Sequence, residues 1–98
     1  MNKRAVLKTL STHAEAIRAF GVKHLYLFGS TARGKARGGS DVDVFVDLDK
    51  AARVSLFEMM DLKAYLGRLL RVPVDVFPRD GLHRVIRADV KREAIWVF

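Results

Sequence analysis

Hydrophobic residues in the first part of the chain change from a helical spacing to a strand-like run. Over residues 3–20 apolar side chains recur every three or four positions, at Leu7, Leu10, Ala14 and Ile17. This spacing predicts an amphipathic helix that is capped by Gly21. Residues 22–28 then form a run of β-branched and aromatic residues that ends at Gly29-Ser30. This run predicts a short strand over Val22–Phe28.

The strictest alternation in the chain runs from Asp41 to Leu48. One face of the predicted strand is apolar and consists of Val42, Val44, Val46 and Leu48. The other face carries three carboxylates and a phenylalanine: Asp41, Asp43, Phe45 and Asp47. The preceding residues 31–40 hold three glycines and three basic residues, so we expect a basic loop with at most one helical turn. The apolar face of the strand should therefore be core.

The second half of the chain returns to helical spacing. Ser55 and Glu58 form a capping box, and seven apolar residues supply the stripe of a long helix: Leu56, Met59, Met60, Leu62, Leu66, Leu69 and Leu70. A third strand is predicted at Pro73–Phe77 and a last helix from Asp80 to Glu93. The apolar end Ala94–Phe98 fits either a final strand or a docking tail.

These elements predict an α/β (α+β) fold in which helices flank a small mixed sheet. A chain of 98 residues, half of them apolar, fits a single domain over residues 1–98. No apolar run approaches the ~20 residues of a membrane span, and the first residues lack the apolar block of a signal peptide. We therefore expect a cytoplasmic protein with no membrane partner. The absence of cysteine excludes disulfides and thiolate chemistry.

The net charge of +7 favours anionic partners such as nucleoside triphosphates, nucleic acid or an acidic protein. The basic residues are spread along the chain and are not interleaved with aromatic residues in the manner of a nucleic-acid platform. Nucleic acid stays a candidate that the pattern does not single out.

Two carboxylates at the start of the second strand are the first candidates for chemistry. Asp41 and Asp43 are two residues apart, so both side chains should point to one face at roughly 6–7 Å separation. Mg²⁺ prefers oxygen ligands and commonly takes one or two carboxylates together with substrate phosphates. Asp75 is the best third ligand for a two-metal site, because Asp47 would lie about 13 Å along the strand from Asp43.

The turn after the first strand is the candidate phosphate site. Gly29 allows close backbone approach to a phosphate, and the Ser30 hydroxyl can donate a hydrogen bond to it. The loop residues Arg33, Lys35 and Arg37 can each offset the negative charge of a triphosphate, and spacing does not choose among them; Arg33 is taken as the nucleotide-binding candidate. Residues 29–35 have the spacing of a P-loop, but Ala36 stands where a metal-binding Ser or Thr is required, so we reject a P-loop.

The remaining polar and aromatic residues suggest structural roles. The three histidines lack any metal-site spacing. Trp96 and the pair Met59-Met60 are interpreted as packing residues.

Taken together, these motifs resemble the minimal nucleotidyltransferases (MNT domains) of the DNA polymerase β superfamily. The residues that carry the resemblance extend over almost the whole chain: Leu25–Ser30, Ala32-Arg33-Gly34, Ser40–Asp43, Leu56-Phe57 and Val74-Asp75-Val76. The resemblance implies a polymerase-β-like nucleotidyltransferase core. It also implies that Gly29 and Ser30 hold the triphosphate of ATP, that Asp41 and Asp43 ligate two Mg²⁺ ions, and that Asp75 completes the metal site and helps to activate the acceptor hydroxyl.

The resemblance also implies a partner. Such domains are commonly encoded beside a HEPN-domain toxin and act as its antitoxin, in known cases by adenylylating it. Larger enzymes of the superfamily add a helical acceptor-binding domain, for which 98 residues leave no room. We therefore expect an adenylyltransferase that modifies a partner protein and assembles with it.

Two alternatives stay open. The first is nucleotidyl transfer to RNA or a small molecule. The second is a non-enzymatic antitoxin that blocks its toxin by occlusion, with the apolar residues Ile95, Trp96 and Phe98 as the interface. The base preference, the acceptor residue and the stoichiometry do not follow from the sequence.

Overall fold

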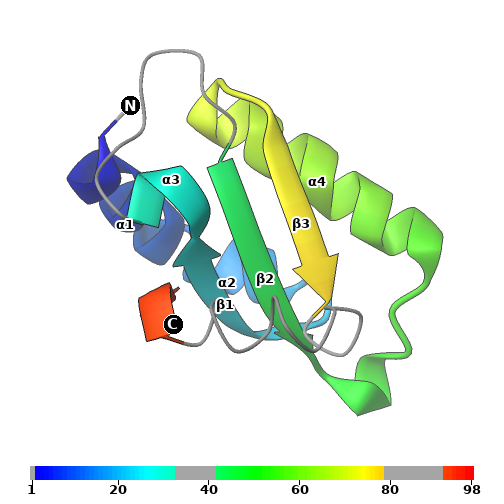
Figure 1. Cartoon of the computed structure of the whole chain (residues 1–98). Helices are drawn as coiled ribbons and strands as arrows, with labels where there is room; N and C mark the ends of the chain where they lie inside the picture. Colours follow the sequence, from blue (N-terminus) through cyan, green and yellow to red (C-terminus); the bar gives the residue numbers. More distant parts are fainter. Residues whose placement is uncertain (1, 33–41, 79–91) are drawn as a thin grey trace.

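The predicted strands assemble into one mixed sheet. The computed structural model describes residues 2–32, 42–78 and 92–98, and only the backbone of Ser30 and Thr31. The sheet has the order β3-β2-β1-β4, in which β1 is antiparallel to both β2 and β4 whereas β2 and β3 are parallel (Figure 1). The strands are β1 (Val22–Phe28), β2 (Val42–Leu48), β3 (Val74–Pro78) and β4 (Ile95–Trp96). The predicted mixed sheet flanked by helices is confirmed.

In the described residues, the predictions of the first three strands hold to within one residue. The first strand matches its prediction, and the third begins at Val74 rather than at Pro73, which lacks the N–H that a ladder needs. Of the two interpretations of the apolar end, the strand is confirmed over Ile95–Trp96. Residues 80–91 of the predicted last helix lie outside the described residues.

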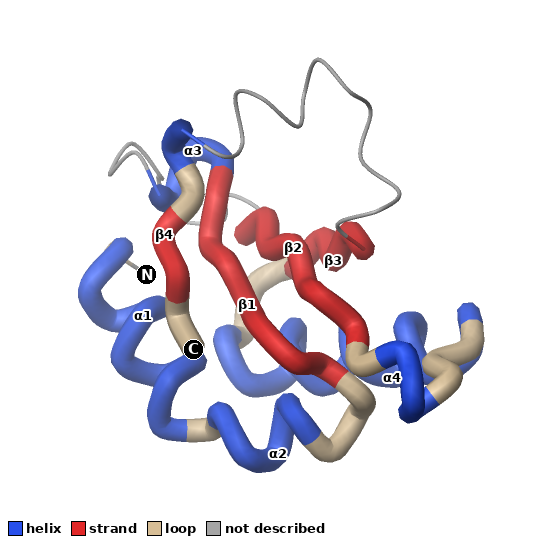
Figure 2. The backbone as a smooth tube through the Cα atoms, turned by 90° about the horizontal axis from the view of Figure 1, so that it is seen from below, coloured by secondary structure: helices blue, strands red, loops and turns tan. Residues whose placement is uncertain are grey.

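The helices that precede and connect the strands cover one face of the sheet. These are α1 (Lys3–Thr12), α2 (Ala14–Arg18) and α4 (Leu56–Leu70), which Figure 2 shows together on one side of the strands. Two short elements complete the described fold: α3 (Gly29–Ala32) and the 3₁₀ turn η1 (Lys50–Ala52). In the described part of the chain, no helix has the length and apolarity to cross a membrane.

The prediction of one continuous helix over residues 3–20 is wrong at His13. This residue leaves helical geometry (φ −102°, ψ 21°) and separates α1 from α2. Its ring Nδ1 lies 2.8 Å from the carbonyl oxygen of Thr9, and its own N–H donates to the same turn. Side-chain bonding to the preceding turn competes with continuation of the helix, and the break lets α2 turn while still burying Ile17.

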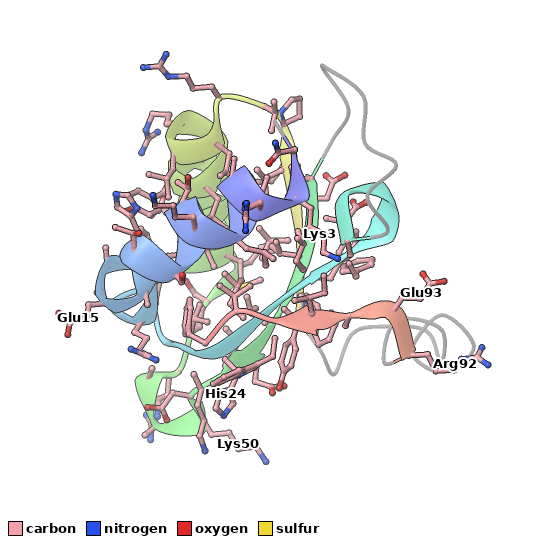
Figure 3. The ribbon with its side chains drawn as sticks, turned by 90° about the vertical axis from the view of Figure 1, so that its left-hand side faces the viewer. Lys3, Glu15, His24, Lys50, Arg92 and Glu93 are labelled. Carbon is pink, nitrogen blue, oxygen red and sulfur yellow. The ribbon has the colours of Figure 1, made fainter. Side chains whose placement is uncertain are left out.

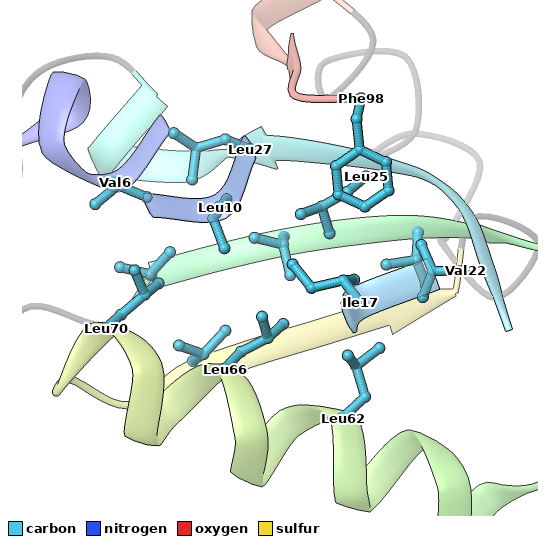
Figure 4. Packing of buried hydrophobic residues seen from close by; sticks show 14 of the residues in the cluster. Val6, Leu10, Ile17, Val22, Leu25, Leu27, Leu62, Leu66, Leu70 and Phe98 are labelled. Atoms are coloured by element: carbon cyan, nitrogen blue, oxygen red, sulfur yellow. The ribbon is translucent and has the colours of Figure 1, made fainter. Parts of the chain in front are cut away.

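The core lies between the covered face of the sheet and the three helices. Leu62 and Leu66 of α4 point toward the strands, opposite Leu25 and Leu27 of β1 (Figure 4). The alternating valines of β2 are also buried in this layer: Val42, Val44 and Val46. The predicted apolar face of the strand is confirmed. Because one face of β2 is fixed in the core, its aspartates must point to the other face.

Part of the apolar stripe predicted for α4 does not enter the core. The helix begins as predicted, with the Ser55 hydroxyl accepting a hydrogen bond from the Glu58 N–H at 3.3 Å. However, Leu56 and Met60 in the first turns are 75% and 60% exposed, whereas Leu62, Leu66 and Leu70 are buried. The stripe assigned from spacing was too wide, because the sheet it packs on ends before the first turn of the helix.

The interpretation of Trp96 and Met60 as packing residues is likewise wrong. Trp96 is 63% exposed, on the edge strand β4. Its neighbour in the tail, Phe98, is buried against the core. Strand alternation would put residues two apart on one face, so the burial of Phe98 reflects a change of backbone direction after β4 ends at Trp96.

Candidate active site

Two of the three predicted metal-binding carboxylates are direct neighbours on the face of the sheet away from the helices. Asp43 of β2 and Asp75 of β3 are register partners in the parallel ladder. Register partners on adjacent strands lie about 4.8 Å apart and share a face, so both side chains project away from the helices. Two acidic groups so placed repel each other unless a cation lies between or beside them.

The turn that follows β1 packs against one of these carboxylates. Gly29 has φ +78°, in the left-handed region, and begins the single-turn helix α3. A Cβ atom at Gly29 would lie 2.5 Å from Asp43 Oδ2, which is too close for any side chain. Gly29 is therefore needed for a close approach of backbone to the Asp43 carboxylate, in addition to the approach to a phosphate predicted from sequence. Figure 1 shows α3 beside the beginning of β2.

Three predicted site residues cannot be placed fully. Asp41 and Arg33 lie outside the described residues, and of Ser30 only the backbone, within α3, is described. Within residues 2–32, 42–78 and 92–98, no three acidic or histidine side chains converge in the manner of a metal site. The described part of the candidate site is thus Gly29, Asp43 and Asp75.

A lysine that sequence analysis did not single out contacts the third carboxylate. Lys63 Nζ of α4 lies 3.5 Å from Asp75 Oδ1, with both side chains about half exposed. Lys63 follows the buried Leu62, so its side chain leaves the helix at the border of the core face and reaches the edge strand β3. The ion pair offsets part of the repulsion between Asp43 and Asp75.

An aromatic cluster forms the floor beside the carboxylates, and sequence analysis also missed it. Phe28 contacts the rings of Phe45 and Phe77, each at a centroid distance of 5.8 Å, and Tyr26 stacks on Phe45 at 4.5 Å. Phe45 is only 2% exposed although it lies on the face away from the core. The sequence signal for this cluster is spacing: Phe45 and Phe77 each lie two residues after an aspartate, Asp43 and Asp75, and so share its face of the strand. This apolar floor lowers the local dielectric and so strengthens the interactions of the adjacent carboxylates.

Asp47, the rejected competitor, lies at the other end of the same face. It pairs in register with His24 and lines a pocket of about 740 Å³ together with Lys23, Lys50 and Arg53. Figure 3 shows His24 and Lys50 near each other at the end of the sheet remote from α3. No described residue offers a hydrogen bond to the buried His24 Nδ1. The described β2–β3 ladder ends with Phe77 and Pro78 opposite Phe45 and Val46, so this ladder pairs Asp47 with no carboxylate, although Asp49 lines the same pocket.

The donor set at Asp43 and Asp75 suits a hard divalent cation. Both groups are carboxylates, and the absence of a Cβ at Gly29 leaves room next to Asp43 Oδ2. These residues fit Mg²⁺ with substrate phosphates as further ligands. The arrangement can therefore hold a metal–triphosphate complex over the β1, β2 and β3 ends of the sheet.

The sequence model of a protein family, the nucleotidyltransferase domain, matches residues 10–97 of this chain. The chain belongs to this family. A protein adenylyltransferase, MntA, from Thermococcus cleftensis is 37% identical over 89 residues, which cover 90% of this chain and 88% of the relative. The sequence-based predictions of a nucleotidyltransferase and of its fold are confirmed.

Solved structures show the same nucleotidyltransferase fold. One, described as a minimal nucleotidyltransferase, is 36% identical with a TM-score of 0.74 and covers 97% of this chain and 95% of its own. Another is a tri-AMPylated HEPN toxin of Shewanella oneidensis in complex with an MNT antitoxin. It matches at 18% identity with a TM-score of 0.68, over 94% of this chain and 71% of that one, a likeness that shows the fold alone.

Proposed function

We propose that this nucleotidyltransferase transfers AMP from ATP to a hydroxyl group of a HEPN-domain toxin and thereby acts as its antitoxin. The observation that carries the proposal is that Gly29 packs against Asp43, and Asp43 pairs in register with Asp75, at one end of the sheet face away from the helices. Two comparisons support the choice of reaction and acceptor. One relative is a protein adenylyltransferase, and one solved structure with this fold is an MNT antitoxin in complex with a tri-AMPylated HEPN toxin.

The proposed roles follow from position. Asp43 and Asp75, with Asp41, would hold two Mg²⁺ ions, which neutralise phosphate charge and polarise the transferred phosphoryl group. The turn at Gly29, with Ser30 and Arg33, would hold the triphosphate, so the nucleotide tail lies on the β1 side of Asp43. Asp75 would take the proton of the acceptor hydroxyl.

In the reaction itself, the acceptor oxygen forms a bond to the α-phosphorus of ATP. The bond from that phosphorus to the β-phosphate oxygen breaks, and pyrophosphate leaves in line with the attack. Since the leaving group lies on the β1 side, the acceptor enters from the side of β3. Adding AMP to the toxin introduces bulk and negative charge where the toxin would bind RNA.

The test is intact-mass spectrometry of the cognate HEPN protein after incubation with this chain, ATP and Mg²⁺. A gain of whole AMP units, absent with Asp43→Asn and retained with Asp47→Asn, is the expected result. An unmodified HEPN protein would overturn the proposal. Omission of Mg²⁺ in a parallel reaction tests the metal requirement.

The occlusion alternative has one observation in its favour. Trp96 presents a large exposed ring at the β4 edge of the sheet, away from the carboxylates. A HEPN toxin that is inhibited but unmodified, with inhibition lost in Trp96→Ser and kept in Asp43→Asn, would favour occlusion through this tail.

A further inference from the structure

Helix α4 has two apolar faces, and only one of them is used by the fold. At about 100° per residue, the buried Leu62, Leu66 and Leu70 lie on one side of the helix. Leu56, Met60 and Ala64, spaced four residues apart, form a ridge that points away from this side, with Phe57 next to it. A helix that is apolar on two sides indicates a second packing partner.

The exposed face is concentrated in the first turns of α4. Leu56, Phe57 and Met60 are 75%, 78% and 60% exposed, and we call these three residues the α4 patch. Three large apolar side chains exposed side by side form a contiguous apolar patch, and such patches on monomeric proteins are often functional. A patch of this size could form the centre of an interface that buries ~800 Å² on each partner.

The α4 patch belongs to the same edge of the molecule as the acceptor side of the active site. Helix α4 packs beside β3, which is the edge strand of the sheet next to β2. Lys63, three residues after Met60 along the helix, contacts Asp75 at 3.5 Å. Lys63, which contacts Asp75, thus lies within one helical turn of Met60, and a protein that covers the α4 patch would lie next to this ion pair.

We propose that the α4 patch is the docking surface for the acceptor protein, which seats an apolar helical face on Leu56, Phe57 and Met60 and presents its hydroxyl over β3 to Asp75. The inference rests on the proposed function, because in-line transfer with the triphosphate on the β1 side requires the acceptor to arrive from the β3 side. A second copy of this chain on the patch would instead occupy the edge through which an acceptor must pass.

The test measures binding separately from transfer. The double variant Phe57→Ser/Met60→Ser is made in the Asp43→Asn background, and its affinity for the cognate HEPN protein is measured by calorimetry without ATP. We expect affinity to fall at least tenfold relative to Asp43→Asn alone, because truncation of central apolar anchors is costly. Trp96→Ser is the matched control, with a similarly exposed aromatic ring on the opposite sheet edge, and should change affinity less than twofold.

Two results would overturn the proposal. The first is an affinity for the HEPN protein that the Phe57→Ser/Met60→Ser double variant leaves unchanged, whether or not Trp96→Ser lowers that affinity. The second is a free chain that is dimeric in sedimentation and becomes monomeric with the double variant, which would assign the patch to a second copy. If binding depends on the α4 patch but no AMP is transferred, the docking surface stands and the proposed transfer fails.

Discussion

Asp43 and Asp47 lie on the same face of the same strand, yet they differ in register partner, in backbone contact and in the charges around them. Asp43 is touched by the Gly29 turn and stands opposite Asp75. Asp47 stands opposite His24 and beside the cations Lys23, Lys50 and Arg53. The two carboxylates are four residues, or about 13 Å, apart along the strand.

The difference shows that the strand pattern alone does not make a carboxylate a metal ligand. Among the described residues, Asp43 has a carboxylate as its register partner and a glycine turn packed against it, whereas the register partner of Asp47 is His24. The pocket at the Asp47 end is lined by two carboxylates, Asp47 and Asp49, and by three cations, Lys23, Lys50 and Arg53, and this net positive lining lowers any attraction for a divalent ion. The comparison can be sharpened by substitutions at each end.

The largest effect is expected for Asp43→Asn. The substitution replaces one carboxylate oxygen by an NH₂ group and removes the negative charge that would hold the metal, so it should lower the rate of AMP transfer by on the order of 10²–10³-fold. The thermal midpoint should change little, since the substitution is isosteric and removes repulsion with Asp75. The matched substitution Asp47→Asn should leave the rate within twofold. Equal losses in both variants would remove the distinction between the two ends.

A smaller effect is expected for Gly29→Ala. Left-handed geometry disfavours alanine by about 1–2 kcal/mol, and the new Cβ must displace the Asp43 carboxylate. We expect a loss of stability together with at least about tenfold weaker Mg²⁺-dependent ATP binding, because small displacements of reactive groups are costly.

Gly21→Ala is the control for this strain. Gly21 also has a positive φ, +95°, and an added Cβ there would meet the Val54 side chain, away from the carboxylates. This variant should lose stability in urea denaturation yet bind ATP normally when folded. Normal ATP binding in Gly29→Ala would mean that the turn is structural only.

The smallest effect is expected for Lys63→Met. The ion pair with Asp75 is half exposed, so its contribution is about 0.2–1 kcal/mol. Removing this competing cation should raise the affinity for Mg²⁺ about two- to fivefold in a fluorescence-detected titration with ATP. Lys23→Met, at the Asp47 end, should not alter Mg²⁺ affinity. A weaker Mg²⁺ affinity in Lys63→Met would indicate that Lys63 itself helps to hold the triphosphate.

The sequence predicted those parts of the fold and site that depend on local periodicity. Strict alternation from Asp41 to Leu48 assigned the core face and hence the direction of Asp43, and the isolated Asp75 in an apolar strand was correctly placed beside it. The same alternation could not reveal the burial of Phe45, because that depends on Tyr26 and Phe28 from another strand.

Features that depend on packing between distant segments were not predictable. The contact of Lys63 with Asp75 exists because α4 lies beside β3, and the exposure of Leu56 depends on where the sheet ends. The break at His13 arises from a side-chain hydrogen bond that competes with the helix, which periodicity cannot detect.

Paramagnetic NMR with Mn²⁺ tests the central claim that the Gly29–Asp43–Asp75 end holds the metal–triphosphate complex. Mn²⁺ can replace Mg²⁺ because carboxylate and phosphate oxygens bind both ions, and it broadens only nearby amide signals. In the presence of ATP, substoichiometric Mn²⁺ should remove the signals of Phe28, Val44 and Val76 first and spare those of Lys23, His24 and Asp49. Selective loss of the signals of Lys23, His24 and Asp49 instead would contradict the assignment of the active site.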